Sequence, residues 1–356
     1  MRMPAGIIFT LTLLVLLPVH GFAKTGQAAP LAGAVIDQAA GRVNDTLVAV
    51  AASTQGLAAA YRDLARTAQP VSPRQREHWL RSYAVKDATV IFRDPDSPCG
   101  PEPAAQAPCP TFLSYKGEQF TDETFRDLGL MTRFAPAMAA AHAAFPFSWV
   151  YLTTPNENFC IYPSLPLAEA VNNDKPTDKD FYKAADFEHR QCGWESPYLD
   201  LAGAGMMVTV SCPAYDGDKL LGVVSRDITL NQLSAEVLRG LATIPGARAA
   251  LMNRRGKAIA ASDPAVAKFI ATENAKAGEA VVYFRADRGL AALGLEKAVD
   301  TPDDALNLAA EAVIEQAAQK TGWPMVINQG KDLILAARIN ITGWYLVLLV
   351  PEKSAR

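Results

Sequence analysis

An apolar residue stands at every seventh position from residue 36 to residue 64, and this repeat constrains the fold more than any other feature of the sequence. A second row begins four residues after the first, which is the spacing of one face of a long helix. The two rows are Ile36, Val43, Val50, Leu57 and Leu64, and Ala40, Leu47, Thr54 and Tyr61. Either a second copy covers this face in a dimeric coiled coil, or the helix packs on its own chain. We favour the second arrangement for a helix over residues 24–70.

The first 23 residues have the pattern of an export signal. Arg2 gives a positive start, residues 6–17 form an apolar run, and residues 21–23 form a small-x-small cleavage site. The run is shorter than the roughly 20 apolar residues that cross a bilayer. We therefore predict a signal peptide over residues 1–23 and a periplasmic or other extracytoplasmic protein. The alternative is an uncleaved N-terminal membrane anchor.

The chain has five cysteines, which suits an oxidising compartment. Cys99 and Cys109 flank a proline-rich loop that has no periodic pattern of its own. We predict a disulfide between them, which would stabilise the fold by roughly 2–3 kcal/mol. The other three, Cys160, Cys192 and Cys212, leave one thiol free, and their pairing stays open at this point.

From Trp149 onward the sequence consists of short β-rich segments separated by turns. The first group is 149–153, 159–162, 206–211 and 220–226. A looser copy follows at 249–252, 258–260, 331–339 and 344–350, with a largely helical stretch over 263–321. We predict an α+β fold in which the long N-terminal helix precedes two lobes, residues 71–240 and 241–356. Each lobe is expected to have an antiparallel sheet and flanking helices.

Composition and motifs narrow the function classes. The formal net charge is −3 and no basic stripe is present, so nucleic acid is not an expected partner. The sequence has no nucleophile elbow, zinc-protease helix or phosphate-binding loop, and we expect a protein that is not an enzyme. His189 and Cys192 form a lone pair of metal-ligand types, so no metal or cofactor is predicted. Two alternatives stay open: an extracytoplasmic hydrolase with scattered carboxylates, and a structural adaptor that binds other proteins.

Six segments resemble, in order and spacing, the double Cache (dCache) domain, the extracytoplasmic sensor of bacterial chemoreceptors and sensor kinases. They are Trp149–Pro163, Asp180–Ala185, Ser196–Asp200, Met207–Asp216, Leu220–Leu230 and Gly343–Glu352. The resemblance implies two PAS-like lobes, with the ligand in the first, membrane-distal lobe. It also implies a sensor for an amine, amino acid or small carboxylate that feeds a signal-transduction or chemotaxis partner, such as a membrane receptor or sensor kinase. A homodimer through the N-terminal helix is a further expectation.

The resemblance also assigns candidate ligand-binding residues. In amino-acid-binding members an Arg-x-Trp-Tyr stretch and a later Asp hold the ligand's carboxylate and ammonium. By position, Lys179, Phe181 and Tyr182 correspond to that stretch, and Asp227 corresponds to the later acid. Lys179 offers a point charge where the family has the fork of an arginine. The ligand class therefore stays open between small amines and small carboxylates.

Three more residues complete the predicted site. Tyr198 and Asp200 match a Tyr-x-Asp pair of the family, and Trp194 precedes them at the entrance to the same strand. Tyrosine and tryptophan rings suit a cation, and their polar atoms suit its oxygens. Judged from the residues alone, the aromatic side chains could equally pack the sheet, and Asp227 could equally close the turn after its strand.

Overall fold

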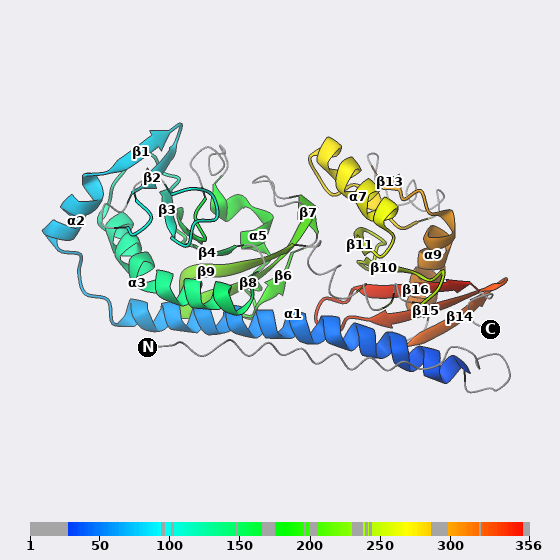
Figure 1. Ribbon diagram of the computed structural model, residues 1–356. Helices are drawn as coiled ribbons and strands as arrows, with labels where there is room; N and C mark the ends of the chain where they lie inside the picture. The colour runs from blue at the N-terminus through cyan, green and yellow to red at the C-terminus, as the bar shows by residue number, and fades with distance from the viewer. Residues whose placement is uncertain are drawn as a thin grey trace, which may run out of the picture.

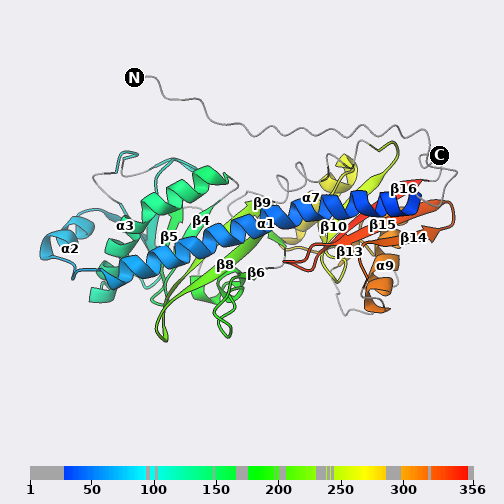
Figure 2. The ribbon, with the colours of Figure 1, turned by 90° about the horizontal axis from the view of Figure 1, so that it is seen from below.

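The computed structural model describes residues 28–93, 97–100, 103–146, 149–165, 175–195, 197–199, 206–229, 238, 241, 244–285, 298–319 and 322–351. Its longest element is α1 (Ala28–Arg66), a helix of 39 residues. At 1.5 Å per residue it is about 58 Å long. The helix runs along one side of two lobes, a distal lobe that follows it in sequence and a proximal lobe that ends the chain (Figure 1, Figure 2).

The distal lobe is built on an antiparallel sheet with the strand order β1-β2-β3-β5-β4-β9-β8-β6, and β7 also pairs with β8. Its strands are β1 (Tyr83–Lys86), β2 (Thr89–Phe92), β3 (Thr111–Ser114), β4 (Val150–Thr153), β5 (Asn158–Tyr162), β6 (Gly193–Trp194), β7 (Tyr198–Leu199), β8 (Met206–Asp216) and β9 (Lys219–Thr229). The longest pair, β8 and β9, is joined at the predicted hairpin turn, where Gly217 has a φ of 58°. Glycine adopts this left-handed conformation at no steric cost.

Helices cover both faces of the distal sheet. Together with α1, α3 (Asp122–Ala144) packs on one face against β3, β4 and β5. The other face carries the short helices η1 (Pro176–Asp178) and α5 (Asp180–Lys183), and α5 contacts β8 and β9. Both α3 and the short α2 (Pro73–Leu80) begin with a capping box, in which Thr121 and Ser72 accept hydrogen bonds from the first turn.

The proximal lobe repeats the arrangement with fewer strands. Its sheet has the order β11-β10-β16-β15-β14, and a short parallel pair, β12 and β13, lies beside it. The elements are β10 (Arg248–Met252), β11 (Ala258–Ala261), α7 (Pro264–Ala277), β12 (Val282–Tyr283), β13 (Val299–Asp300), α9 (Asp304–Gln319), β14 (Met325–Gln329), β15 (Asp332–Arg338) and β16 (Tyr345–Pro351). The helices α7 and α9 lie on the side away from α1 (Figure 1).

The apolar stripe of α1 is the common core of the two lobes. Its buried members are Ile36, Ala40, Val43, Leu47, Val50, Thr54, Leu57 and Tyr61. They pack on β8, β9 and α3 in the distal lobe, and on β14, β15 and β16 in the proximal lobe. Tyr61, for example, lies 5.3 Å from Phe134 of α3, measured between ring centroids. The arrangement favoured from the sequence, a helix packed on its own chain, is therefore confirmed.

The α+β fold with two antiparallel sheets agrees with the prediction, and some local assignments need correction. The polar stretch 178–187, which has helical spacing, forms only the end of η1 and the single turn of α5. The stretch 263–321 contains α7 and α9 but also β12 and β13. A capping box of Thr229 and Gln232 in the sequence also predicts a helix over residues 230–241, which lies almost wholly outside the described residues. No helix among the described residues combines the length and apolar character that a membrane crossing requires.

Two disulfides are present. One joins Cys99 to Cys109, the pair predicted from the sequence, and the other joins Cys192 to Cys212. The remaining cysteine, Cys160, is the free thiol, and it is buried under α3 with its sulfur 3.8 Å from that of Met138. Burial raises the pKa of this thiol well above its usual range, so Cys160 is an inert core residue.

Candidate functional site

The face of the distal sheet that points away from α1 has a buried carboxylate at its centre. Side chains alternate between the two faces of a strand, so Thr209 of β8 and its partner Asp227 of β9 lie on this face. The Asp227 side chain is only 4% exposed. Its Oδ1 accepts hydrogen bonds from the hydroxyls of Thr209 (2.7 Å), Tyr151 (2.9 Å) and Tyr198 (3.3 Å). Charge-assisted bonds of this kind stabilise a buried carboxylate.

Two tyrosines enclose this carboxylate. Tyr151 comes from β4 and is fully inside the lobe, where burial first and the neighbouring Asp227 second raise the pKa of its hydroxyl far above the usual range. Tyr198 of β7 is half-buried and also bonds Thr209 at 2.8 Å. The Tyr151 hydroxyl therefore stays protonated and donates. Tyr198 lies between Asp227 and the cavity described next, because it lines that cavity and Asp227 does not.

A cavity of about 470 Å³ lies at the edge of the distal sheet, against the proximal lobe. Its distal wall includes Asp180, Trp194, Glu195 and Tyr198, and its proximal wall includes Lys257 and Glu279. Figure 1 shows β6 and β7 at the edge of the distal lobe that faces β11 and α7. The volume is within the range of small-molecule sites in proteins.

Glu195 is an acid of this cavity whose pKa is strongly raised. Its backbone N–H donates to the Thr209 carbonyl at 2.9 Å, which fixes it directly after β6. Its Oε2 atom is buried and has no hydrogen-bond partner among the described residues. Burial raises the pKa of Glu195 to about 8, with smaller contributions from the negative charges of Asp227 and Asp180. A bound cation would stabilise the ionised carboxylate.

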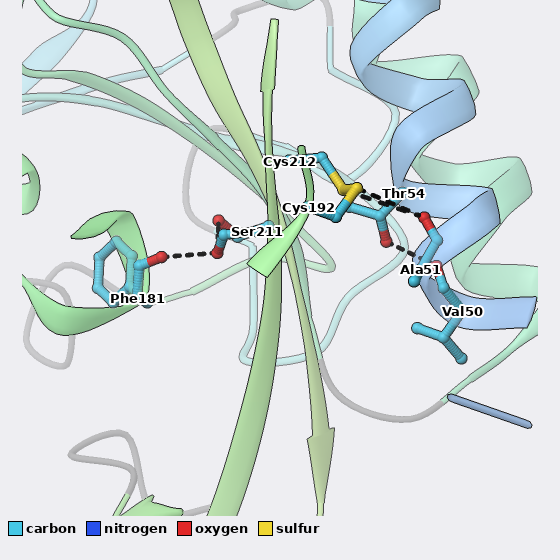
Figure 3. The surroundings of a disulfide bond; sticks show 8 residues. Val50, Ala51, Thr54, Phe181, Cys192, Ser211 and Cys212 are labelled. Carbon is cyan, nitrogen blue, oxygen red and sulfur yellow. Dashed lines mark hydrogen bonds between the residues drawn. A yellow bond between two sulfur atoms is a disulfide. The ribbon is translucent and has the colours of Figure 1, made fainter. Parts of the chain in front are cut away.

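The Cys192–Cys212 disulfide and a glycine position Glu195. The disulfide holds the chain before β6 to β8, on the α1 side of the sheet, and both sulfur atoms lie 3.9 Å from the Ala51 carbonyl oxygen (Figure 3). Gly193 then passes so close to α5 that a Cβ atom would overlap the Ala184 carbonyl. No larger residue fits there without moving one of the two segments. The backbone that leads to Trp194 and Glu195 is thus held by the disulfide on the α1 side of the sheet and by the contact with Ala184 on the other side.

The structure separates the other predicted residues. Phe181 lies against Tyr151, with ring centroids 5.1 Å apart, and its carbonyl accepts a hydrogen bond from Ser211 at 2.6 Å (Figure 3). Tyr182 is buried in a different cluster with Ala185 and Val223. Burial raises its pKa to about 12.

The remaining two predicted residues do not line the cavity within the described structure. Lys179 is half-buried and precedes α5, outside the cavity lining. Asp200 lies outside the described residues. The structure therefore brings Trp194 and Tyr198 together at the cavity, places Asp227 directly behind Tyr198, and leaves Lys179 and Tyr182 elsewhere.

Sequence reasoning missed the charged residues of the cavity, which are Asp180, Lys183, Glu195, Lys257 and Glu279. Glu195 is adjacent to the predicted Trp194, so a search for acids beside the predicted aromatic residues would have found it. Lys257 belongs to the other lobe, and nothing in its local sequence indicates the contact. No group of three or more metal-ligand side chains occurs within the part of the chain that the structure describes.

Comparison with known proteins identifies the distal lobe. Residues 144–235 match the family model described as the first PDC sensor domain of methyl-accepting chemotaxis protein-like proteins. The chain contains a sensor domain of this type. The match starts just before β4 and ends after β9, so it includes Tyr151, Glu195, Tyr198 and Asp227. The match supports a double Cache sensor domain, as predicted from the sequence.

The chain is also similar to three named proteins. The methyl-accepting chemotaxis protein McpC of Bacillus subtilis is 32% identical over 87 residues, which are 24% of this chain and 13% of McpC. The ligand-binding domain of the Pseudomonas aeruginosa amino acid chemoreceptor PctB, in complex with L-Arg, is 14% identical with a TM-score of 0.49, covering 93% of this chain and 98% of that one. The sensory domain of the Campylobacter jejuni chemoreceptor Tlp3, with isoleucine bound, is 13% identical with a TM-score of 0.46, covering 92% and 95%.

Proposed function

We propose that this sensor domain acts outside the cytoplasm and binds a small molecule that carries an amine, in the cavity beside Glu195. The observation that supports it most directly is at Glu195, which lines a cavity of ligand size and has a buried oxygen, Oε2, that no described residue bonds. A buried polar atom without a partner is costly, and a ligand donor removes that cost. The PctB domain binds L-Arg and the Tlp3 domain binds isoleucine, and an amino acid carries such a donor.

Glu195 is the proposed direct partner of the ammonium, and the aromatic residues complete its surroundings. Trp194 and Tyr198 line the cavity together with Glu195, and the Trp194 ring also packs against Trp344 of the proximal lobe. An indole or phenol ring attracts a cation that lies over its face, by roughly 0.5–2 kcal/mol. Asp180 at the cavity and Asp227 behind Tyr198 add negative potential, since both raise the pKa of Glu195. The wall therefore favours a positive group.

Asp227, which the family resemblance assigns to the ammonium, has an indirect role in this proposal. Three hydroxyls already bond its Oδ1, and Tyr198 separates it from the cavity. Its charge orients the Tyr198 hydroxyl, and Tyr198 in turn shapes the wall beside Glu195. Loss of Asp227 would therefore weaken binding through a misplaced tyrosine as well as through a lost charge.

We further propose a periplasmic or other extracytoplasmic location and a chemotaxis or sensor-kinase partner. Two disulfides favour an oxidising compartment. The predicted signal peptide, residues 1–23, lies outside the described residues. A homodimer through the N-terminal helix would use the exposed side of α1, where Val35 and Val48 lie, because the apolar stripe is buried within the chain.

Isothermal titration calorimetry with phenethylamine, isoamylamine, agmatine and putrescine tests the proposed site. At least one amine is expected to bind the mature protein, and Glu195→Gln should weaken it by tenfold or more, because the variant has lost the counter-charge. Glu273→Gln on the surface of α7 is the matched control and should bind like the parent. If no amine or amino acid binds, or if Glu195→Gln binds as tightly as the parent, the proposed site is wrong.

A further inference from the structure

The Cys192–Cys212 disulfide forms part of the wall of a second cavity. This cavity has a volume of about 220 Å³ and lies between α1, β8 and the segment that precedes β6. A space of about 150 Å³ is enough for a benzene molecule, so the cavity has room for a small thiol. Cys192 is half-buried, whereas Cys212 is 1% exposed. A molecule in the cavity therefore reaches the sulfur of Cys192 more readily than that of Cys212.

The other disulfide is placed differently. The cavity beside its loop is lined by several prolines of that loop but by neither Cys99 nor Cys109. Cys109 is 2% exposed. A small thiol in that cavity would therefore lie beside the loop rather than against the sulfur atoms.

The charged side chains that line the cavity at Cys192 are basic. They are Arg62 of α1 and Arg190, which precedes β6. Arg62 pairs with Asp63 at 2.9 Å and Arg190 with Asp218 at 2.7 Å, but both aspartates are exposed to solvent and neither lines the cavity. Guanidinium groups beside a disulfide favour an attacking thiolate and stabilise the thiolate that leaves.

The disulfide holds a segment that has few other backbone bonds to the sheet. The strand β6 consists of Gly193 and Trp194 alone, and both pair with β8. Glu195 follows and donates one backbone hydrogen bond to β8. The disulfide closes the other end of the segment, directly before Gly193. Breaking the bond therefore loosens the part of the chain that carries Glu195.

The same two sulfur atoms face α1. Each lies 3.9 Å from the Ala51 carbonyl oxygen (Figure 3). A disulfide has no hydrogen to donate, whereas a thiol is a weak donor. Reduction therefore changes a polar contact on the helix that packs on both lobes.

We propose that the Cys192–Cys212 bond is a site of thiol–disulfide exchange with a small anionic thiol, and that its reduction weakens ligand binding. The incoming thiolate bonds to Cys192 Sγ, the bond between the two cysteines breaks, and Cys212 leaves as a thiolate that takes up a proton. A second thiolate then bonds to the small molecule's sulfur and releases Cys192. Two small thiols are oxidised to one disulfide, and the protein gains two thiols. The effect on binding rests on the proposed amine site, and the exchange does not.

Alkylation and mass spectrometry test the exchange itself. The folded protein is incubated with 2-mercaptoethanesulfonate, and the thiols that appear are alkylated at intervals and mapped. Cys192 and Cys212 should appear about tenfold faster than Cys99 and Cys109, because their bond lines the cavity. If Cys99 and Cys109 appear first or at the same rate, or if the cysteines react only when the protein unfolds, the exchange site is wrong.

A matched pair of thiols tests the role of the arginines. The sulfonate adds a negative charge that 2-mercaptoethanol lacks, and the ratio of their two rates removes differences in protein stability. This ratio should fall by about fivefold in the double variant Arg62→Gln, Arg190→Gln, because the cavity has lost its positive charge. Arg74→Gln, at an exposed position on α2, is the control and should keep the parent's ratio. An unchanged ratio in the double variant would contradict the preference for an anionic thiol.

Calorimetry with agmatine tests the effect on binding. Protein reduced at Cys192 and Cys212 should bind agmatine about tenfold more weakly than the oxidised protein, and reoxidation should restore the affinity. The variant Cys192→Ser, Cys212→Ser should bind weakly and no longer respond to the thiol. If the bond is reduced and the affinity stays the same, control of binding is wrong, while the exchange and the amine site stand. If neither agmatine nor another amine binds the oxidised protein, the proposed function and the control of binding fail together, and the mapping alone decides the exchange.

Discussion

The two lobes share one architecture and differ in how they fill the sheet face that points away from α1. In the proximal lobe this face is apolar, with Ala250, Met252, Ile334, Ala336, Val347 and Leu349 packed under α7 and α9. In the distal lobe the same face carries Tyr151, Thr209, Ser211, Ser225 and Asp227, all buried. The same fold therefore has an ordinary core in one lobe and a buried polar layer in the other.

The difference shows where a ligand can bind. Buried polar groups cost free energy unless they are hydrogen-bonded, and most of the distal layer is bonded internally. Ser211, for example, bonds Ser225 at 2.8 Å and the Phe181 carbonyl at 2.6 Å. The layer ends at Glu195, whose buried oxygen has no partner among the described residues. Within the layer, Trp149 Nε1 and Thr153 Oγ1 are also buried without a partner among the described residues. A polar layer that is mostly bonded inside and has an unbonded carboxylate oxygen at its edge suits a binding site, whereas the apolar proximal layer suits packing.

The largest expected effect is the loss of stability caused by a substitution in the apolar layer of the proximal lobe. Leu349 is 1% exposed and packs in the proximal core, so Leu349→Ala should lower the free energy of unfolding by about 2–5 kcal/mol. Ligand affinity should stay within about twofold, since the residue is remote from the cavity. Chemical denaturation and calorimetry measure the two quantities. Leu308→Ala on α9, where the side chain is 48% exposed, is the control and should change stability by less than about 0.5 kcal/mol. An equal loss in both variants would contradict the distinction between core and surface.

How much of this fold was predictable depends on the strength of the local pattern. The seven-residue repeat predicts α1 almost to its ends, because a stripe of that length needs one continuous partner surface. The hairpin of β8 and β9 follows from alternation and a glycine turn. Residues 71–148 gave no such signal. Their strands β1, β2 and β3 have four residues each, and α3 contains Pro136, which weakens its helical pattern.

The candidate site was predictable only where its residues share a strand pattern or a family spacing. Tyr198 and Trp194 lie at the cavity as the family spacing indicates. Tyr182 does not, because α5 is a single turn and two consecutive residues point to different clusters, Phe181 toward Tyr151 and Tyr182 toward Val223. Lys257 could not be predicted, since its place opposite Glu195 depends on how α1 holds the two lobes together.

The second-largest expected effect is the loss of stability on removing either disulfide. The two bonds should differ in their effect on ligand binding. Replacing Cys192 and Cys212 by serine, or Cys99 and Cys109 by serine, should each lower the free energy of unfolding by about 3 kcal/mol, because the sequence separations are 20 and 10 residues and the effect grows only slowly with loop length. Only the first pair should also weaken ligand binding, by about tenfold, because that bond fixes the path to Glu195. Denaturation and calorimetry on both double variants measure this. Equal affinities in the two would show that Glu195 needs no such support.

The pH dependence of stability tests whether the pKa of Glu195, at the edge of the polar layer, is raised in the folded protein. The pKa of Glu195 is raised from 4.5 to about 8 in the folded protein, so the folded state holds a proton that the unfolded state has lost. Stability from this group is complete below pH 4.5, declines as the pH rises toward 8, and then levels off. Glu195→Gln should lack this decline, which thermal unfolding between pH 4 and pH 9 measures. A parent and variant with parallel profiles would show that Glu195 is not perturbed.

The pH dependence of ligand affinity should have the opposite sign to that of stability, and it depends on the same residue, Glu195. A bound ammonium favours the ionised carboxylate, so binding below pH 8 releases a proton from Glu195. The affinity for agmatine, which stays charged, should rise by up to about tenfold per pH unit toward pH 8 and then become constant. Calorimetry in two buffers of different ionisation enthalpy detects the released proton. An affinity that is flat from pH 6 to pH 8 would contradict Glu195 as the ammonium partner.

The smallest expected effect concerns the exposed rim of the same cavity. Asp180 lines the cavity but is exposed to solvent, so its charge is screened by water and salt. Asp180→Asn should weaken the affinity for a cationic ligand by a factor of about two to five, the range of exposed charge pairs. Calorimetry at 20 mM and 500 mM sodium chloride should show the difference shrink at high salt. Glu195→Gln, by contrast, removes a buried charge, and its larger effect should change little with salt. If Asp180→Asn has as large and as salt-resistant an effect as Glu195→Gln, the ammonium lies at the rim, and the contrast between a bonded interior and an unsatisfied edge does not locate the ligand.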